Sequence, residues 1–159
     1  MDRLDRRGLT GPLRAWLAAG RPFLGICLGL QLLFEASDED GAATLGVLPG
    51  RTRRLEAAPT LPHIGWNQAE LCTCSDLFEG IPDGSAFYFV HSYGVVPRSP
   101  GDVLCMTDYD GVTFVSGIET GNLAAVQFHP EKSSTLGLRL YRNFARKAGL
   151  AVEDAPSRA

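Results

Sequence analysis

The sequence predicts an α/β fold, with helices on both faces of a mostly parallel sheet that includes an antiparallel section. The apolar segment Phe23–Ile26 has the length of a buried strand and runs directly into a helix expected over residues 28–35. From about Leu45 to Phe128 the pattern changes to short apolar segments separated by turns, which indicates antiparallel strands.

A helix is expected before this first strand. It begins at Thr10, which we expect to cap it, and ends at Gly20. Leu13, Trp16 and Leu17 share its inner face at helical spacing.

The elements after the first strand follow the same rules. The helix over 28–35 turns Leu28, Leu32 and Leu33 toward the sheet, and an exposed loop over 37–41 ends it. A last helix over 133–148 buries one face. Turn signals separate the strands at Pro49-Gly50, Pro82–Gly84, Pro97–Gly101 and Asp110-Gly111.

One domain accounts for the whole chain. Its 159 residues, 45% hydrophobic and 21% charged, are enough for a single core, which we place at residues 1–150 with a flexible tail at 151–159. A formal net charge of −3 gives no attraction for nucleic acid. The longest apolar run is too short to cross a bilayer and the N-terminus lacks the apolar segment of a signal peptide, so we expect a cytoplasmic protein.

Cysteine spacing argues against a metal site. The four cysteines, Cys27, Cys72, Cys74 and Cys105, do not have the spacing of zinc ligands. We therefore expect reduced thiols, with no metal and no cofactor.

Cys27 lies between Gly25 and Gly29, where the first strand turns into a helix. Such a turn strains the nucleophile's backbone and brings neighbouring chains close, so it favours glycine on both sides. A helix N-terminus lowers the pKa of a thiol, and we expect Cys27 to ionise easily. This motif alone leaves open that Cys27 is only a small buried hydrophobic residue.

A second motif lies about a hundred residues further along the chain. Apolar residues from Leu123 lead to His129 at the expected end of a strand. A cysteine and a histidine far apart in sequence are typical of a thiol nucleophile and its base. Glu131 can point to the same side as His129 in extended backbone and accept a hydrogen bond from the imidazole. A lone histidine would more often be structural, but its occurrence with the Cys27 motif favours catalysis.

Together these motifs are recognisable. Residues 25–29 with Gln31, and residues 127–131, strongly resemble the class I (triad) glutamine amidotransferases, in which a Cys-His-Glu site hydrolyses the side-chain amide of glutamine. Residues 63–67, 87–93 and 132–134 resemble the branch that serves imidazole glycerol phosphate synthase in histidine biosynthesis. The resemblance covers nearly the whole chain and implies a flavodoxin-like three-layer fold.

The resemblance also implies roles for individual residues. Cys27, His129 and Glu131 would be the catalytic triad, and the backbone N–H of Leu28 an oxyanion donor. The substrate glutamine would be held by Gln31 and by the backbone of Ser92 and Tyr93. The partner would be a cyclase subunit with a (β/α)₈ barrel, in a heterodimer whose barrel receives the ammonia, and the residues near that interface would be Trp66, Tyr88 and Lys132.

On physical grounds alone, several of these residues have simpler interpretations. Trp66 could be a core tryptophan, Tyr88 a buried strand tyrosine and Lys132 a solvated lysine. Gln31 and Ser92 could be surface groups. His63 and His91 are interpreted as structural, since His129 already supplies the base.

The sequence departs from the family's pattern at its start. Family members begin with a strand, a helix, a second strand and a glycine-rich segment that completes the oxyanion hole, all before the helix that corresponds to residues 4–7. We therefore expect an N-terminally incomplete fold, with Met1 as an internal methionine or the chain as a fragment. Only the Leu28 N–H would remain as an oxyanion donor, and we expect the short chain to be poorly stable.

Three other functions stay open. The chain could serve another amidotransferase of the same class, for anthranilate, guanylate (GMP) or carbamoyl phosphate synthesis. It could be a stand-alone thiol hydrolase acting on γ-glutamyl peptides. It could also be a truncated, inactive module that only docks on the cyclase.

Overall fold

The computed structural model describes residues 1–39, 41 and 43–152. Its helices are α1 (Asp2–Arg6), α2 (Thr10–Ala18), α3 (Leu28–Gln31) and α4 (Ser134–Lys147), with short 3₁₀ helices η1 (Asp76–Phe78), η2 (Pro100–Asp102) and η3 (Pro130–Lys132). Its strands are β1 (Phe23–Ile26), β2 (Ala36–Ser37), β3 (Gly50–Arg54), β4 (His63–Leu71), β5 (Ser85–His91), β6 (Tyr93–Pro97), β7 (Val103–Tyr109), β8 (Val112–Thr120) and β9 (Leu123–Val126).

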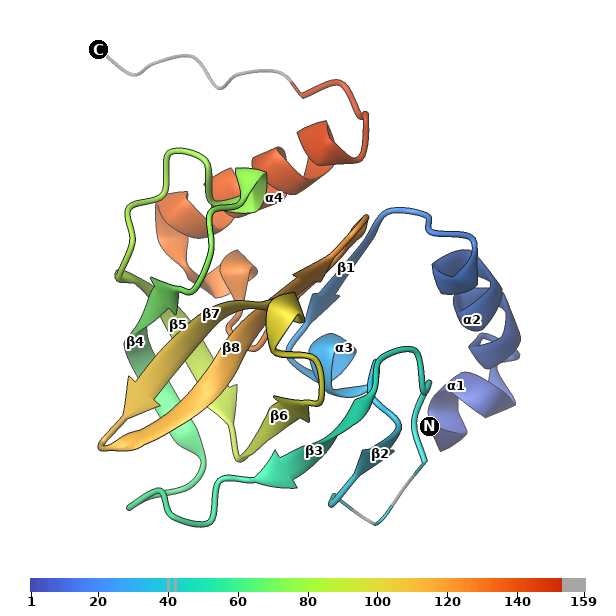
Figure 1. Cartoon of the computed structure of the whole chain (residues 1–159), viewed down its shortest axis with the longest axis horizontal. Coiled ribbons are helices and arrows are strands. Elements are labelled where there is room, and N and C mark those ends of the chain that lie inside the picture. Colours follow the sequence, from blue (N-terminus) through green and yellow to red (C-terminus); the bar gives the residue numbers. More distant parts are fainter. Residues whose placement is uncertain (40, 42, 153–159) are drawn as a thin grey trace.

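The strands form one twisted sheet (Figure 1). Seven of them run in the order β2-β3-β6-β8-β7-β4-β5, while β9 pairs with β8 and carries β1 at its other edge. Among the strands of the described residues, β1–β9 and β2–β3 are parallel pairs, and the other pairs are antiparallel.

The prediction of a mostly parallel sheet is therefore wrong for the described residues. Parallel neighbours need long crossover connections, whereas a two-residue turn joins antiparallel strands. Asp110 and Gly111 both have positive φ and join the long strands β7 and β8 as a hairpin. The middle of the chain thus builds most of the sheet from antiparallel pairs.

Helices cover opposite faces of the β1–β9 pair, which gives a three-layer arrangement. Ala124 and Val126 of β9 lie in one core cluster with Leu140 of α4. The alternate residues Leu123 and Ala125 lie in a second cluster with Leu30 of α3. Side chains alternate between the two faces of a strand, so β9 contributes to both cores.

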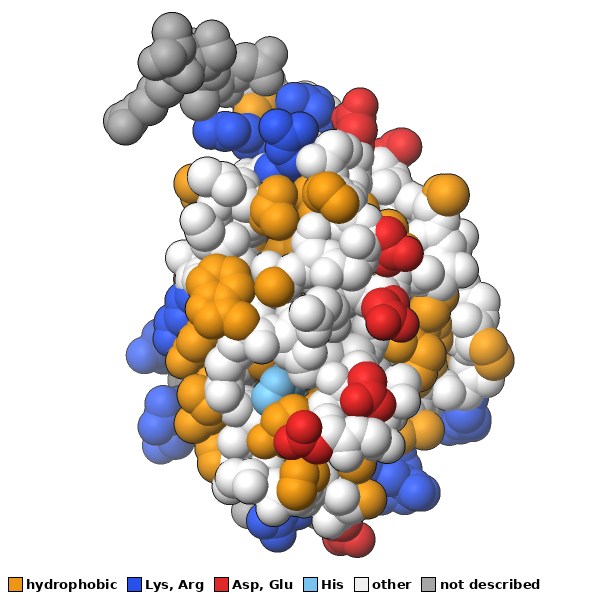
Figure 2. Space-filling model, turned by 90° about the vertical axis from the view of Figure 1, so that its left-hand side faces the viewer, with side chains coloured by type: hydrophobic (Ala, Val, Ile, Leu, Met, Phe, Trp, Pro, Cys, Tyr) orange, Lys and Arg blue, Asp and Glu red, His pale blue; other side chains and the backbone are white. Residues whose placement is uncertain are grey.

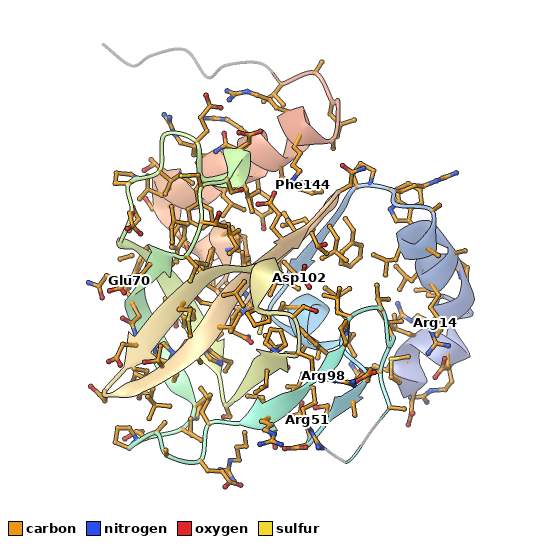
Figure 3. All side chains as sticks on the ribbon, viewed as in Figure 1. Arg14, Arg51, Glu70, Arg98, Asp102 and Phe144 are labelled. Atoms are coloured by element: carbon orange, nitrogen blue, oxygen red, sulfur yellow. The ribbon has the colours of Figure 1, made fainter. Side chains whose placement is uncertain are left out.

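The last helix agrees with its prediction, since α4 spans Ser134–Lys147. Leu140 is fully buried, and Leu136 and Phe144 pack against the same core cluster. Phe144 lies on the side of α4 that faces the sheet (Figure 3). Residues 153–159, most of the expected tail, lie outside the described residues.

The helix behind Cys27 is shorter than the predicted range of 28–35: α3 ends at Gln31. The amides of residues 45–48 donate hydrogen bonds to the carbonyls of Leu32, Leu33 and Phe34 and replace helical partners there. Leu33 and Phe34 enter the core, whereas Leu28 is 56% exposed and does not face the sheet as predicted.

The N-terminal helix α2 also differs in detail. Leu9, not Thr10, is its N-cap residue, and the Thr10 hydroxyl donates to the Asp5 carboxylate at 2.5 Å. Leu17 packs against the second core cluster, but Trp16 is 42% exposed and its indole N–H donates to the Pro22 carbonyl. In the described part of the chain, no helix is long and apolar enough to span a membrane.

Candidate active site

Cys27 lies at the turn between β1 and α3, in a backbone conformation that non-glycine residues seldom adopt (φ 49°, ψ −102°). Its N–H donates to the Val126 carbonyl at 2.8 Å, which fixes the turn against the end of β9. Since Ile26 and Val126 are paired in register, Cys27 and Gln127 leave the two parallel strands side by side.

The two flanking glycines have different roles. A Cβ atom on Gly25 would lie 2.9 Å from the Ala125 Cβ and 2.9 Å from the Gly29 carbonyl carbon, so this position requires glycine. A Cβ atom on Gly29 would meet nothing within 4 Å. The expectation that close approach requires glycine on both sides is therefore wrong at Gly29.

The thiol of Cys27 is partly buried, and burial raises its pKa above the ordinary value. The Leu28 N–H and the side-chain amide of Gln127, whose Nε2 lies 3.4 Å from Sγ, lower the pKa by less. The expectation of an easily ionised cysteine is therefore wrong. The four-residue α3 sums the dipoles of few peptide groups, and desolvation of the thiol outweighs their effect.

The side chains of His129 and Glu131 contact one another just beyond the end of β9. Glu131 Oε1 lies 2.6 Å from His129 Nδ1, as predicted, but Glu131 belongs to the 3₁₀ helix η3 and not to extended backbone. The backbone N–H of His129 donates to the Tyr88 carbonyl at 2.8 Å, which holds this segment against β5. Burial alone would raise the pKa of the Glu131 carboxyl, but hydrogen bonds from His129 and Tyr141 lower it below the ordinary value.

The second nitrogen of His129 is available for chemistry. Nε2 is buried and has no hydrogen-bond partner among the described residues. With Nδ1–H donating to the carboxylate, Nε2 carries the lone pair. This is the tautomer of a general base.

The residues expected to bind glutamine lie around Cys27. Gln31 is buried, and its Nε2 donates to the Tyr93 carbonyl at 3.1 Å and to Gln127 Oε1 at 3.2 Å. Tyr93 opens β6, and the carbonyl of the preceding residue, Ser92, accepts from the Leu55 N–H at 3.0 Å. The structure thus brings Gln31 and the backbone at residues 92–93 to the same place, with the Gln31 amide already used inside the protein.

The residues expected near a partner also lie together. Trp66 of β4 and Tyr88 of β5 are opposite one another, with edge-to-face rings 6.2 Å apart. Lys132 Nζ lies 5.6 Å from the centre of the Tyr88 ring. Trp66 is 55% exposed and its neighbour Ile64 is 59% exposed. Figure 2 shows the face that carries β4, where hydrophobic side chains lie beside a row of acidic ones.

Sequence analysis gave no functional role to three polar residues around the site, because Gln127 appeared only within a motif and His63 and His91 were interpreted as structural. Gln127 stands between Gln31 and the thiol, and its place beside Cys27 follows from the β1–β9 register. His63 and His91 form a buried pair opposite one another on β4 and β5. Burial lowers the pKa of His91 to about 4 and also lowers the pKa of His63. Only knowledge of the β4–β5 register could have paired these histidines.

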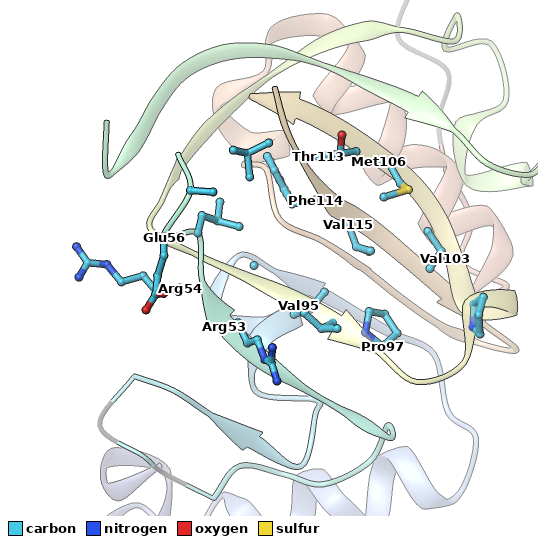
Figure 4. Close-up of a pocket in the computed structure, with 16 residues that line it drawn as sticks. Arg53, Arg54, Glu56, Val95, Pro97, Val103, Met106, Thr113, Phe114 and Val115 are labelled. Atoms are coloured by element: carbon cyan, nitrogen blue, oxygen red, sulfur yellow. The ribbon is translucent and has the colours of Figure 1, made fainter. Parts of the chain in front are cut away.

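A larger hollow lies elsewhere on the sheet. Its volume is about 530 Å³ and apolar side chains such as Val95, Val103 and Phe114 line it (Figure 4). None of the predicted site residues lines it. A small hollow of about 110 Å³ lies beside Leu28 and Gln31. Within the described ranges, no group of three or more His, Cys, Asp or Glu side chains could hold a metal ion.

Comparison with known proteins identifies the family. The family model described as class-I glutamine amidotransferase matches residues 5–148. The chain belongs to the class-I glutamine amidotransferases. Within this family, it is similar to proteins named imidazole glycerol phosphate synthase subunit HisH. The relative from Moorella thermoacetica is 50% identical over 155 residues, which are 95% of this chain and 73% of the relative.

Further relatives of this amidotransferase agree. The HisH subunit of Aquifex aeolicus is 50% identical over 93% of this chain and 72% of the relative. The HisH subunit of Symbiobacterium thermophilum is 46% identical over 99% of this chain and 74% of the relative. The chain therefore spans about three quarters of the length of these relatives.

Solved structures of glutamine amidotransferases share the fold. One described only as a glutamine amidotransferase matches with a TM-score of 0.64 and 23% identity, over 92% of this chain and 71% of that one. A glutamine amidotransferase from Thermotoga maritima matches with a TM-score of 0.59 and 22% identity, over 91% of this chain and 57% of that one. At these identities the likeness shows the fold alone.

Proposed function

We infer that this protein is the glutaminase subunit, HisH, of an imidazole glycerol phosphate synthase. It hydrolyses glutamine to glutamate and ammonia, and a cyclase subunit uses the ammonia to make imidazole glycerol phosphate and aminoimidazole carboxamide ribotide. The observation that supports this most is the placement of strained Cys27 beside the end of β9, with the His129–Glu131 pair just beyond it. We assign the amidotransferase domain to residues 1–150.

The first half of the reaction forms a thioester. His129 Nε2 takes the proton from the Cys27 thiol, and Sγ attacks the carboxamide carbon of glutamine. Burial raises the pKa of the thiol, so we expect proton transfer to His129 to accompany this attack. The C–N bond then breaks, the imidazolium gives its proton to the leaving nitrogen, and ammonia departs from a γ-glutamyl thioester.

The second half regenerates the enzyme. His129 takes a proton from water, whose oxygen attacks the thioester carbon, and glutamate leaves as the Cys27 thiol is restored. Glu131 holds the Nδ1–H and stabilises the imidazolium in both halves. The backbone N–H of Leu28, which lies beside the sulfur, would donate a hydrogen bond to the oxyanion.

We propose that the substrate and the partner contact different residues. Gln31 and the backbone of Ser92 and Tyr93 would hold the glutamine. Free ammonia is mostly protonated at neutral pH, so it must pass directly to the acceptor enzyme. We propose a heterodimer with a cyclase subunit that has a (β/α)₈ barrel, docked over Trp66, Tyr88 and Lys132, in the cytoplasm. The exposure of Trp66 and Ile64 on β4 supports this placement.

The test is glutamate release by the protein mixed with its cyclase subunit. Cys27→Ala removes the nucleophile and should lower the rate by about 10⁴-fold or more. Cys72→Ser is the matched control, because Cys72 is an exposed thiol away from the described site. A Cys27→Ala protein that binds the cyclase and still turns over glutamine at the parent rate would contradict the proposal.

A further inference from the structure

A continuous line of hydrogen bonds leads from the hairpin of β4 and β5 to the Cys27 sulfur. His63 Nδ1 lies 3.2 Å from His91 Nε2, and His91 Nδ1 lies 2.8 Å from the Tyr93 carbonyl oxygen. That oxygen also accepts from Gln31, whose Nε2 contacts Gln127 Oε1. Gln127 Nε2 in turn faces the Cys27 sulfur.

Chemistry gives every bond in this line a direction. A carbonyl oxygen only accepts, so His91 must carry its proton on Nδ1. Neutral His91 then has a lone pair on Nε2, and His63 must donate to it from Nδ1. The remaining His63 nitrogen, Nε2, accepts from Asn67 Nδ2 at 3.4 Å. Both histidines are thus Nδ1–H tautomers, and protonation of either would set two donors against each other.

Because a carbonyl oxygen only accepts hydrogen bonds, the orientations of the two glutamine side-chain amides are fixed as well. Gln31 turns its NH₂ group to the Tyr93 carbonyl, so it also presents N–H to Gln127 and meets the carbonyl end of that side chain. Gln127 must then present its own NH₂ group to Cys27. If Gln31 flipped, its carbonyl would face the Tyr93 carbonyl, and the N–H beside the thiol would be lost.

Packing holds the histidines in place. The His63 ring stacks on Tyr109 at 4.0 Å between ring centres, and His91 lies edge-on to Phe114 at 4.9 Å. His63 and His91 are 3% and 6% exposed. Buried polar groups that are fully paired make a rigid arrangement, and loss of one partner is costly.

We propose that His91, supported by His63, is a positioning residue of the glutaminase site, which fixes the Tyr93 carbonyl and thereby points the Gln127 N–H at the Cys27 sulfur. This role rests on the proposed function, because it acts on the nucleophile of that reaction. A donor beside sulfur stabilises the thiolate, and this matters here because burial opposes ionisation of Cys27.

The first test compares two amide variants of His91. His91→Asn keeps an N–H at the position of Nδ1, whereas His91→Gln places its amide near the position of Nε2 and leaves the Tyr93 carbonyl without this donor. Both are made in the full chain with Cys72→Ser and Cys74→Ser, which remove the exposed thiols. The rate of Cys27 alkylation by iodoacetamide is followed by mass spectrometry from pH 6 to pH 10, and needs neither glutamine nor cyclase.

We expect His91→Gln to alkylate about tenfold more slowly at pH 7, with its profile moved to higher pH, and His91→Asn to follow the parent protein. Thr107→Val, at a buried hydroxyl outside this line, should leave the profile unchanged. A folded His91→Gln protein with the parent profile would overturn the proposal, as would an equal shift in His91→Asn. Absence of glutamate release by the parent protein mixed with its cyclase subunit, with the thiol profiles as expected, would instead count against the proposed function and leave this inference standing.

A second test needs no variant at these histidines. The ¹⁵N chemical shifts of the imidazole rings in the folded wild-type chain report which nitrogen carries the proton. We expect Nδ1–H and unprotonated Nε2 for both His63 and His91 at neutral pH. An Nε2–H tautomer at His91 would overturn the proposal.

Discussion

Two histidine environments in this molecule differ in one respect, the use of the second ring nitrogen. At the end of β9, the Nδ1 of His129 contacts Glu131, and its buried Nε2 has no hydrogen-bond partner among the residues that the structure describes. On the β4–β5 hairpin, His91 uses both nitrogens, one toward the Tyr93 carbonyl and one toward His63. A spare nitrogen can move a proton, whereas a fully bonded ring can only hold its neighbours. Burial alone would not separate these two roles.

The largest effect that would sharpen this comparison is expected at Glu131. Glu131→Gln keeps the size of the side chain but removes the carboxylate that fixes the His129 tautomer and stabilises the imidazolium. Glutamate release in the presence of the cyclase should fall by about 10²- to 10⁴-fold. Glu79→Gln, at an exposed carboxylate paired with Arg146 away from the site, serves as control and should keep the parent rate. Parent activity in Glu131→Gln would remove the basis for treating His129 as the general base.

For the paired histidines His63 and His91, we expect an effect on the free energy of unfolding and its dependence on pH. The folded-state pKa of His91 is about 4, below the ordinary value, and that of His63 is lowered as well. Between the folded-state pKa and the ordinary pKa of about 6.5, the unfolded chain binds more protons than the folded one. The stability contributed by the neutral histidines is therefore full above about pH 6.5 and is lost as the pH falls toward 4. For His91 this amounts to about 3 kcal/mol.

The groups that face this pair set its charge environment. His63 and His129 disfavour a proton on His91, while Asp110 favours one on His63. Urea unfolding at pH 7 and at pH 4.5 measures the loss, and His91→Asn should reduce the pH dependence. A free energy of unfolding that stays constant over this range would contradict the buried neutral pair.

The smallest effect concerns the turn that carries Cys27. Gly25→Ala brings a Cβ atom to 2.9 Å from Ala125 and from the Gly29 backbone, so it should destabilise the protein by about 1–3 kcal/mol. Gly29→Ala is the matched control, since a Cβ atom there meets open space on a helix and costs little or stabilises slightly. Equal losses for the two substitutions in thermal unfolding would show that close approach at Gly25 is not the constraint.

The sequence predicted local features better than tertiary ones. Strand Phe23–Ile26 and the last helix follow from apolar spacing. His129 and Glu131 do meet, but Glu131 lies in the 3₁₀ helix η3 and not in the extended backbone that the prediction assumed. The raised pKa of Cys27 was missed, because it depends on burial by segments distant in sequence. The His63–His91 pair depends on the β4–β5 register.

The direction of the sheet shows the same limit. Asp110-Gly111 was recognised as a turn, yet the mostly parallel sheet expected from the βα pattern around Cys27 does not extend through the hairpin that this turn makes. The early end of α3 likewise depends on residues 45–48, which take the carbonyls that a longer helix would have used. Long-range hydrogen bonds decided both outcomes.

The most direct test of the account is to look for the intermediate on Cys27. The protein and its cyclase subunit are mixed with glutamine, quenched in acid within a single turnover and digested, and the peptides are weighed. The account predicts a γ-glutamyl thioester on the peptide that contains Cys27, and its accumulation in Glu131→Gln if the second step is slowed more than the first. Glutamate release with the glutamyl group on another residue, or with no acylated peptide in any variant, would contradict it.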